Sequence, residues 1–425
     1  MVGWYSRPMR ADWRRIGLLF TLALALRTAW VLAVDRVGWV LNDALMYHAL
    51  ASGIIQGNGF TDLTGQPMAQ WPPGFPGLLA LLYWVFGQHP VVGELCNALI
   101  GALTVVVLYL AVDRALGRKV ATIASVILCV MPGPILWTDM LLSETLLTFV
   151  FVSFFALVAR SKPTWAWAAA LGVVIGLGVM VRGEALTWGL VPLVLWYREV
   201  PWRTWLPRMA LMGLVVLLAM TPWTIRNART MGAFVPLATN SSGTLWVGHN
   251  PNATGAQMYP PPEYYEQFGT EAPARELDSA KALRSEAIRY MLTHPVDEVR
   301  LIPWKLTAMF RGDSYAFDWV NAAPEPPLSA TNVERIGTVA DAAWFALVAF
   351  TALGVVGLGR AAWRQPMMRA IATSLATMLF LYGFLYYGNY RYRLPYMPLM
   401  IVVAALVLSK CWSALRARTP ANTAA

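Results

Sequence analysis

An acidic residue, Asp43, follows directly on the first apolar segment of the chain, within the stretch NDALMYH. A carboxylate at the edge of a bilayer is costly, and a purely structural loop has no need of one. It can accept a proton from a reacting group, so we expect chemistry on a lipid-borne substrate here. Tyr47 and His48 follow about one helical turn later and are predicted to position Asp43 or to contact the substrate. In the alternative interpretation, Asp43 caps a helix and His48 is an interfacial residue.

The composition identifies an integral membrane protein. Of the 425 residues, 57% are hydrophobic and 13% are charged, and the mean hydropathy is +0.50, whereas a soluble domain has about 25% charged residues. The net charge of +10 is therefore expected at cytoplasmic helix ends, and no nucleic-acid partner is predicted. The three cysteines lack metal-binding spacing and are interpreted as small buried hydrophobes. The first apolar run has no small-residue cleavage site, so it is predicted to remain as a span.

Apolar runs of suitable length predict an all-α, polytopic membrane protein with about ten transmembrane helices. These runs lie near residues 16–34, 90–112, 120–137, 141–159, 165–181, 185–197, 209–225, 339–358, 370–387 and 394–408. A shorter run at residues 75–86, bracketed by Pro and Gly, is interpreted as a re-entrant or juxtamembrane helix, because 10 to 14 apolar residues rarely cross a bilayer alone.

The distribution of Lys and Arg predicts the orientation. With both termini in the cytoplasm, every predicted inside segment is basic, and the short outside segments contain few basic residues, as the positive-inside rule requires. The expected location is the cell (inner) membrane. We predict a transmembrane module at residues 1–225 with a first extracytoplasmic loop at 35–89, an extracytoplasmic cap at 226–338, and C-terminal transmembrane helices at 339–425.

The predicted cap has mixed signals. The run TNSSGTLWVGHNPNATG contains many turn-forming residues and predicts a chain of turns, and later segments are amphipathic. We expect a mostly helical cap, because Trp246, Trp304 and Trp319 favour packing. The alternative is a partly disordered loop.

Several segments together resemble a known family. They are the PPGFP turn of the first loop, SETL at 143–146, the GHNPNATG run at 248–255 and the terminal YRYRLPYMPL at 390–399. The chain is similar in these segments to the family 39 type glycosyltransferases, membrane enzymes of the GT-C fold related to protein O-mannosyltransferases and to the lipid A aminoarabinose transferase. The resemblance implies a polyprenyl-phosphate-linked sugar donor, an extracytoplasmic lipid, glycan or protein acceptor, and an inverting mechanism in which a first-loop carboxylate, here Asp43, is the base.

Glu144 is a second acidic residue in an apolar context, near the outer end of a predicted span. Such a carboxylate needs a partner or a function. We expect it to support the base, to bind a metal or to contact the sugar, and an ion pair with Arg182 or Arg27 is the alternative. The family includes members with and without a metal, and two scattered carboxylates do not define a site, so a divalent metal is left unassigned.

Four arginines are candidates for binding the donor phosphate: Arg182, Arg226, Arg391 and Arg393. The planar guanidinium can bind two phosphate oxygens and stabilise the charge that develops on the leaving group. In an extended segment Arg391 and Arg393 would project to the same side. The tyrosines between and beside them also fit an interfacial aromatic belt, which is the alternative.

The chain departs from the aminoarabinose branch of the family before the double proline. Where those relatives tend to have Lys, this chain has Gln70 followed by Trp71, so one expected phosphate ligand is missing. Trp71 is predicted to stack on a sugar face or to belong to the aromatic belt.

Two functions remain as alternatives to a transferase: an oligosaccharide ligase or polymerase with the same donor, and a flippase or transporter of lipid-linked sugars. A transporter should show matching broken helices in two halves, and the sequence contains no obvious repeat.

Overall fold

The computed structural model describes residues 12–34, 42–158, 162–197, 199–268, 273–320 and 327–418. The beginning of the predicted first loop, at 35–41, and residues 321–326 of the predicted cap lie outside the described residues. Helices supply the regular structure of the described ranges, apart from one isolated bridge between Thr61 and Pro67, and this confirms the all-α prediction. The larger helices before the cap are α1 (Trp13–Ala33), α2 (Asn42–Ile55), α3 (Gly74–Phe86), α4 (Pro90–Leu116), α5 (Arg118–Val130), α6 (Pro132–Leu136), α7 (Glu144–Val158), α8 (Trp165–Val181), α9 (Leu190–Trp196) and α10 (Trp202–Met231).

We call the next five helices the cap. They are α11 (Asn240–Gly248), α12 (Pro262–Glu266), α13 (Ala274–Thr293), α14 (Pro295–Met309) and α15 (Phe317–Val320). The chain ends with α16 (Ala330–Gly357), α17 (Gly359–Trp363), α18 (Pro366–Phe380) and α19 (Met397–Arg418). Short 3₁₀ helices and one π-helical segment, η4, connect several of these helices. They are η1 (Trp137–Asp139), η2 (Gly183–Gly189), η3 (Asp313–Ala316), η4 (Leu381–Leu385) and η5 (Tyr390–Tyr396).

The described helices include six that are long and apolar enough to cross a membrane, or up to seven if α5 and the segment after it form one span bent by 51°. This confirms a multi-pass membrane protein. The predicted spans near 141–159, 165–181 and 185–197 correspond to the shorter α7, to α8 and to η2 with α9. The count of about ten therefore stays a prediction. Helix α7 begins only at Glu144, α8 matches its predicted run, and the third run is divided between η2 and α9, where Gly183, Gly189 and Pro192 lie.

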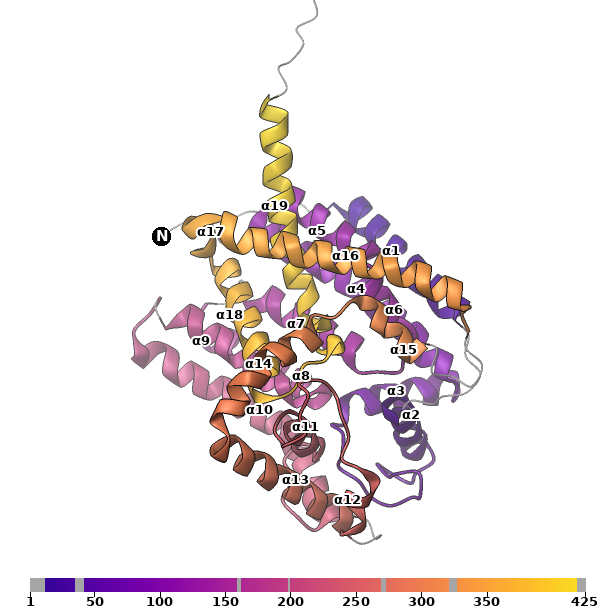
Figure 1. The fold of residues 1–425 in the computed structure, drawn as a ribbon. Coiled ribbons are helices and arrows are strands. Elements are labelled where there is room, and N and C mark those ends of the chain that lie inside the picture. Colours follow the sequence, from indigo (N-terminus) through magenta and orange to yellow (C-terminus); the bar gives the residue numbers. More distant parts are fainter. Residues whose placement is uncertain are drawn as a thin grey trace, which may run out of the picture.

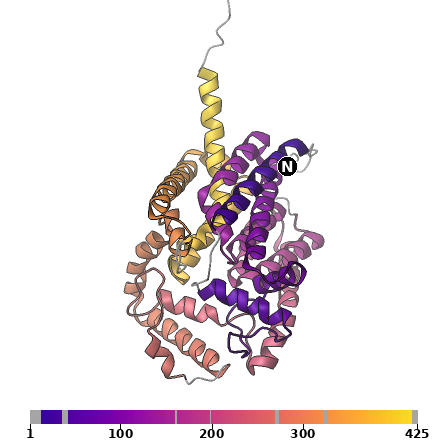
Figure 2. The same ribbon diagram turned by 90° about the vertical axis from the view of Figure 1, so that its right-hand side faces the viewer.

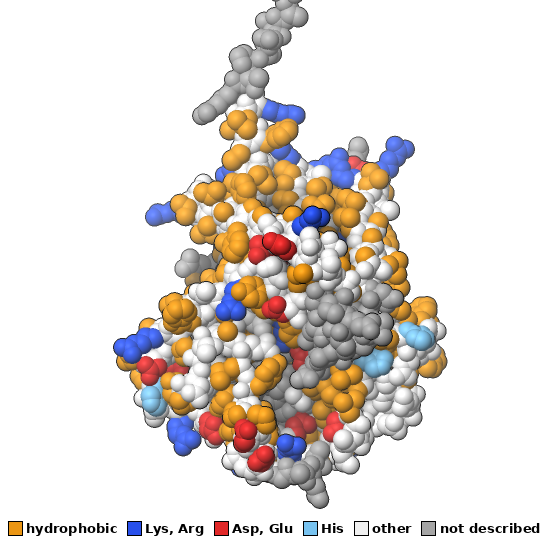
Figure 3. Space-filling view, turned by 45° about the vertical axis from the view of Figure 1, so that its right-hand side comes forward, with side chains coloured by type: hydrophobic (Ala, Val, Ile, Leu, Met, Phe, Trp, Pro, Cys, Tyr) orange, Lys and Arg blue, Asp and Glu red, His pale blue; other side chains and the backbone are white. Residues whose placement is uncertain are grey.

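The cap and the C-terminal end of α19 lie at opposite ends of the molecule in both ribbon views (Figures 1 and 2). On the face shown in Figure 3, acidic side chains gather toward the cap end, and Lys and Arg side chains surround the end from which α19 emerges. Lys and Arg side chains also occur at the cap end (Figure 3), so the orientation with an extracytoplasmic cap stays a prediction.

Helix α4 is the centre of the N-terminal half and packs against α1, α5 and α7. Arg27 of α1 is 1% exposed and donates hydrogen bonds to the backbone oxygens of Ala23, Leu128 and Cys129. The close packing needs Gly101, because a Cβ at that position would lie 2.6 Å from Arg27 Nε. Arg27 is thus a structural residue, and the alternative prediction that Arg27 forms an ion pair with Glu144 is wrong.

The cap is mostly helical, as predicted, but one part of the prediction was wrong. The run TNSSGTLWVG is not a chain of turns, because residues Asn240–Gly248 form α11, which packs on α13. Trp246 is buried and donates to Glu286, and Trp319 donates to the hydroxyl of Tyr390. Trp304, in contrast, is 64% exposed.

The PPGFP turn fixes the first loop against the end of α8. Gly74 begins α3, and a Cβ there would lie 2.6 Å from the carbonyl oxygen of Met180. Only glycine permits this approach without a shift of the backbone. The glycine of the motif therefore has a packing role next to Arg182, which ends α8.

We predict that Gly74→Ala lowers the stability of the protein by about 1–3 kcal/mol, because the added methyl group overpacks a backbone contact. Gly77→Ala is the matched control, since Gly77 lies in the same helix with nothing within 4 Å of a Cβ. This control should stabilise the helix by about 0.5–1 kcal/mol. Thermal unfolding of both variants in detergent checks the prediction, and equal melting temperatures would contradict it.

Candidate functional site

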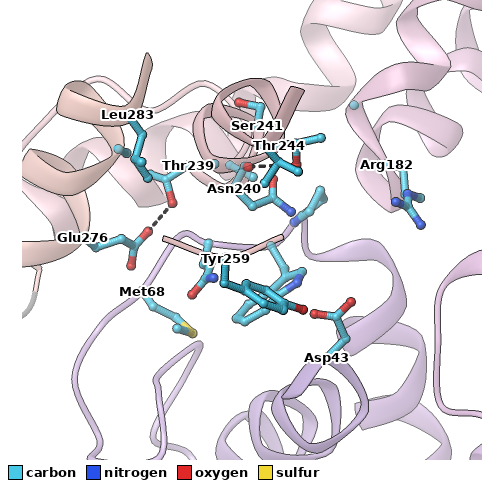
Figure 4. Close-up of a pocket in the computed structure, with 18 of the residues that line it drawn as sticks. Asp43, Met68, Arg182, Thr239, Asn240, Ser241, Thr244, Tyr259, Glu276 and Leu283 are labelled. Carbon is cyan, nitrogen blue, oxygen red and sulfur yellow. Dashed lines mark hydrogen bonds between the residues drawn. The ribbon is translucent and has the colours of Figure 1, made fainter. Parts of the chain in front are cut away.

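A cavity of about 760 Å³ opens between the first-loop segments, α11, α13 and the chain near η5 (Figure 4). Six of the nine residues predicted for the site line this cavity: Asp43, Tyr47, Trp71, Glu144, Arg182 and Arg391. His48, Arg226 and Arg393 do not line it. The cavity is large enough for a drug-sized ligand, since such pockets measure roughly 300–1,000 Å³.

Asp43 lies in the first turn of α2, and Figure 4 shows its carboxylate directed into the cavity. Its Oδ2 accepts a hydrogen bond of 2.9 Å from Arg391 Nη1. The Asp43 side chain is 25% exposed, and that of Arg391 is 8% exposed. The carboxylate thus remains accessible from the cavity, and the cation behind it is held within the protein.

Glu144 connects the two arginines of the cavity. Its Oε1 lies 2.7 Å from Arg182 Nη1 and 3.5 Å from Arg391 Nε. Arg182 also lies 3.6 Å from Glu184, a residue that sequence reasoning missed. Of the two predicted partners of Glu144, Arg182 is therefore confirmed. Three carboxylates and two guanidinium groups form one charged wall of the cavity.

Tyr47 and Trp71 form the floor beside this wall. The Tyr47 ring packs edge-on against the rings of Trp71 and Phe75. Burial, with the nearby Asp43 carboxylate, raises the pKa of Tyr47, so its hydroxyl keeps its proton. Trp71 is 8% exposed, and most of its ring therefore contacts protein rather than open space.

Two predicted site residues have structural contacts elsewhere. His48 follows Tyr47 in α2 and faces away from the cavity, where its Nδ1 lies 2.8 Å from the hydroxyl of Tyr83. Arg226 donates to the backbone oxygens of Phe60 and Met68. It therefore braces the first loop and does not reach the cavity.

The prediction that Arg391 and Arg393 project to one side is wrong. The segment Tyr390–Tyr396 is a 3₁₀ helix and not an extended strand. Arg393 accordingly points into the protein, where it pairs with Asp313 and lies over the Trp344 ring, 3.8 Å from its centroid. Of the two arginines in the motif, Arg391 is the one at the cavity.

The cap supplies a second wall that sequence reasoning did not identify. Glu276 of α13 accepts hydrogen bonds from Thr239 Oγ1 at 2.7 Å and from the backbone N–H of Ala69 at 3.1 Å. Burial raises the pKa of Glu276, and these hydrogen bonds oppose the effect. The contacts join the first loop, the start of α11 and α13. The only sequence signal was the dense run of Asn, Ser and Thr before Leu245, which we interpreted as turns.

A buried cluster joins α14 to the chain after α18. His249 Nδ1 lies 2.6 Å from Glu298, and His249 Nε2 lies 2.9 Å from the backbone oxygen of Leu385. Lys305 has no exposed surface and lies 3.8 Å from the same Glu298 carboxylate. The GHNP segment singled out in the sequence therefore holds the backbone that leads to Arg391.

The described residues contain no group of three or more His, Cys, Asp and Glu side chains arranged to hold a metal ion. The cysteines are free: Cys129 is buried, Cys96 is half-buried and Cys411 is exposed. The prediction of burial is thus wrong for Cys411, which lies in the last turns of α19 beyond the packed helices.

Residues 70–225 match the family model of dolichyl-phosphate-mannose-protein mannosyltransferase. No curated protein sequence matches the chain. Among solved structures, the oligosaccharyltransferase of Archaeoglobus fulgidus in complex with Zn and sulfate superposes with a TM-score of 0.54 at 14% identity, covering 95% of this chain and 50% of the other. The archaeal oligosaccharyltransferase AglB from the same organism, in complex with an inhibitory peptide and a dolichol-phosphate, gives 0.51 at 13% identity, with 95% and 52% coverage.

ArnT from Cupriavidus metallidurans bound to undecaprenyl phosphate gives a TM-score of 0.46 at 15% identity, with 96% of this chain and 80% of that chain covered. The present chain spans about half the length of the Archaeoglobus enzymes. The likeness to the Archaeoglobus structures confirms the predicted GT-C fold. At these identities it shows the fold alone.

We predict a pH-dependent contribution of Lys305 to stability. Burial lowers the pKa of Lys305 to about 8, although Glu298 opposes the shift, whereas an unfolded Lys has a pKa of about 10.4. Between these values the unfolded state binds more protons, so raising the pH stabilises the folded state. The melting temperature of the wild type relative to Lys305→Met should therefore rise from pH 8 to pH 10.

Lys281→Met is the matched control, because Lys281 is exposed on α13. Its melting temperature should stay parallel to that of the wild type over the same pH range. If the Lys305→Met curve were also parallel, the depressed pKa of Lys305 would be refuted.

Proposed function

We propose that this GT-C fold membrane protein is a glycosyltransferase that moves a sugar from a polyprenyl-phosphate-linked donor to an extracytoplasmic acceptor. The observation that supports this most directly is the contact of 2.9 Å between Asp43 and Arg391 at the wall of the cavity. A candidate base and a candidate phosphate-binding cation therefore face the same cavity, and glycosyl transfer from a phosphate uses both. The family model, named for a dolichyl-phosphate-mannose enzyme, and the lipid phosphates bound in AglB and ArnT agree with such a donor.

Arg391 binds the phosphate in the proposed mechanism. Its guanidinium is fixed by Asp43 on one side and approached by Glu144 on the other, so little reorganisation is needed when negative charge develops on the leaving phosphate. Arg182 lies behind Glu144 and adds a second positive charge to the same wall. A guanidinium is suited to this task because it can donate to two phosphate oxygens at once.

Asp43 is the general base. A phosphate bound by Arg391 places the anomeric carbon next to the Asp43 carboxylate, on the side open to the cavity. The acceptor hydroxyl attacks this carbon, Asp43 takes its proton, and the lipid phosphate leaves with the bonding electrons of the carbon–oxygen bond. Attack on the face opposite the leaving phosphate inverts the anomeric configuration.

Glu144 acts through the arginines. Its side chain is 3% exposed, and its Oε2 has no hydrogen-bond partner among the described residues. It is too deeply placed to act as the base, and its Oε1 holds Arg182 and approaches Arg391. We assign it a positioning role.

The ligase or polymerase alternative uses the same donor chemistry and differs in the length of the sugar chain that is moved. The transporter alternative is disfavoured by the site itself. Asp43, Glu144, Arg182, Glu184 and Arg391 lie together on one wall of the cavity. Translocation of a lipid-linked sugar needs no base next to a phosphate-binding cation. The proposed orientation places the cavity outside and the termini in the cytoplasm.

We predict that Asp43→Asn lowers kcat of sugar transfer by about 10²–10⁴-fold, the contribution typical of a general base, and leaves the affinity for donor largely intact. The assay uses purified protein, radiolabelled polyprenyl-phosphate sugars and extracted envelope fractions, and measures both the free lipid phosphate and the sugar transferred. Asp278→Asn, on the exposed face of α13, should retain wild-type activity. Full turnover by Asp43→Asn would exclude Asp43 as the base.

We predict that Arg391→Ala and Arg393→Ala affect different quantities. Arg391→Ala should raise the KM for donor by about 10–100-fold, because a charged hydrogen bond contributes about 1.5–3 kcal/mol. Arg393→Ala should instead lower stability by about 3–5 kcal/mol, since it leaves the buried Asp313 without its partner. Donor titrations and thermal unfolding of both variants separate the two effects. A selective loss of donor affinity in Arg393→Ala would show that the assignments are reversed.

A further inference from the structure

The cavity has two chemically different walls. One wall, built by α2, the start of α7, the end of α8 and η5, carries the charged groups described above, and Asp62, Arg275 and Glu276 line the cavity elsewhere. The opposite wall contains neutral polar side chains from α11 and the first loop, namely Gln66, Gln70, Asn240, Ser241 and Thr244. Figure 4 shows α11, with Asn240 and Thr244, on the side of the cavity opposite Asp43.

The neutral wall has hydrogen-bonding capacity to spare. The side chains of Gln70, Asn240 and Ser241 form no hydrogen bond with any part of the chain that the structure describes. The hydroxyl of Thr244 donates to the backbone oxygen of Asn240 and keeps free lone pairs. Amides and hydroxyls can both donate and accept hydrogen bonds. This wall therefore matches a ligand whose own polar groups also both donate and accept hydrogen bonds.

An aromatic ring lies between the two walls. Tyr259 is 68% exposed, and Figure 4 shows its ring extending across the cavity with the hydroxyl toward the Asp43 carboxylate. A large aromatic surface in a polar cavity offers an apolar face for stacking at a small cost in side-chain entropy. A ring with apolar C–H faces and a polar rim would fit between Tyr259 and α11.

The neutral wall is also preorganised. Glu276 holds Thr239 and the backbone of Ala69 through hydrogen bonds of 2.7 and 3.1 Å, which fixes the start of α11 against the first loop. Trp246, near the end of α11, donates to Glu286 of α13 at 3.0 Å. Fixed polar groups lose little entropy on binding, which favours recognition of a ligand with defined hydroxyl positions.

We propose that the neutral wall is the acceptor subsite and that the acceptor group is a sugar. Its hydroxyls bind Gln70, Asn240 and Ser241, and its ring packs on Tyr259. One acceptor hydroxyl oxygen forms a bond to the anomeric carbon of the donor, the bond from that carbon to the phosphate oxygen breaks, the proton passes to Asp43, and the electron pair leaves with the lipid phosphate. This assignment rests on the proposed function and specifies its acceptor.

The test measures transfer of sugar from each radiolabelled polyprenyl-phosphate sugar to acceptors of three chemical classes. The probes are 4-nitrophenyl glycosides of common hexoses, short peptides containing Ser and Thr, and a long-chain alcohol in detergent. Purified wild type is compared with Asn240→Ala, Ser241→Ala and Tyr259→Ala. Ser285→Ala is the matched control for Ser241→Ala, because Ser285 is exposed on α13 and lies outside the cavity.

We expect transfer to a glycoside, with the acceptor KM raised about tenfold in Asn240→Ala and Tyr259→Ala, about threefold in Ser241→Ala and not in Ser285→Ala. The KM for donor should change less than twofold in each. Transfer to the peptide or the alcohol and not to any glycoside would overturn the acceptor assignment and leave the transferase intact. If the wild type cleaves no donor with any acceptor and Asp43→Asn behaves identically, the proposed function fails as well.

Discussion

The candidate site depends on one buried carboxylate, that of Glu144. Its Oε1 accepts from Arg182 and approaches Arg391 at 3.5 Å, and through Arg391 it is linked to Asp43. A buried charge is tolerated only when it is paired, and removing one partner leaves the other uncompensated. The position of Asp43, the proposed base, is therefore not set by α2 alone. It follows from a chain of charges that begins inside the protein and ends at the cavity.

These charges come from segments that are distant in sequence but share one property: each lies where a helix is interrupted. Arg182 caps α8 with extended backbone (φ −153°), and Asn389 is extended (φ −145°) and accepts from the backbone N–H of Arg391 with its side chain. Glu144 begins α7. Irregular backbone at membrane depth is stable only when it is buried in protein or lines a polar cavity. The helix breaks and the cavity thus require each other, since the breaks supply the polar groups and the cavity accommodates them.

Part of this arrangement could be predicted from sequence because charge is scarce in the chain. Asp43, Glu144, Arg182 and Arg391 stand in apolar surroundings, where each charge implies a partner, and all four line the cavity. The orientation of Arg393 could not be predicted, because it depends on whether the backbone is extended or 3₁₀.

Sequence was also uninformative where local propensity and tertiary packing disagree. The run starting at Asn240 has the composition of turns, yet it forms α11 because its apolar residues pack on α13. His48 was predicted with Tyr47 because both follow Asp43 by about one helical turn, although only residues three or four apart share a helix face. The number of spans stays a prediction, since α7, α8 and the η2–α9 segment are apolar but have only 10–17 residues each.

The division of the cavity into two walls separates two kinds of recognition. The charged wall is built from helix ends that hold one another through Glu144, so substitutions there disturb several groups at once. The neutral wall comes from α11 and the first loop, and the side chains of Gln70, Asn240 and Ser241 form no hydrogen bond within the described residues that a substitution would remove. A change on this wall alters hydrogen bonding to a ligand without removing a charge from the opposite wall. In the proposed transferase, the charged wall can therefore keep the same chemistry for every acceptor while the neutral wall determines which acceptor binds.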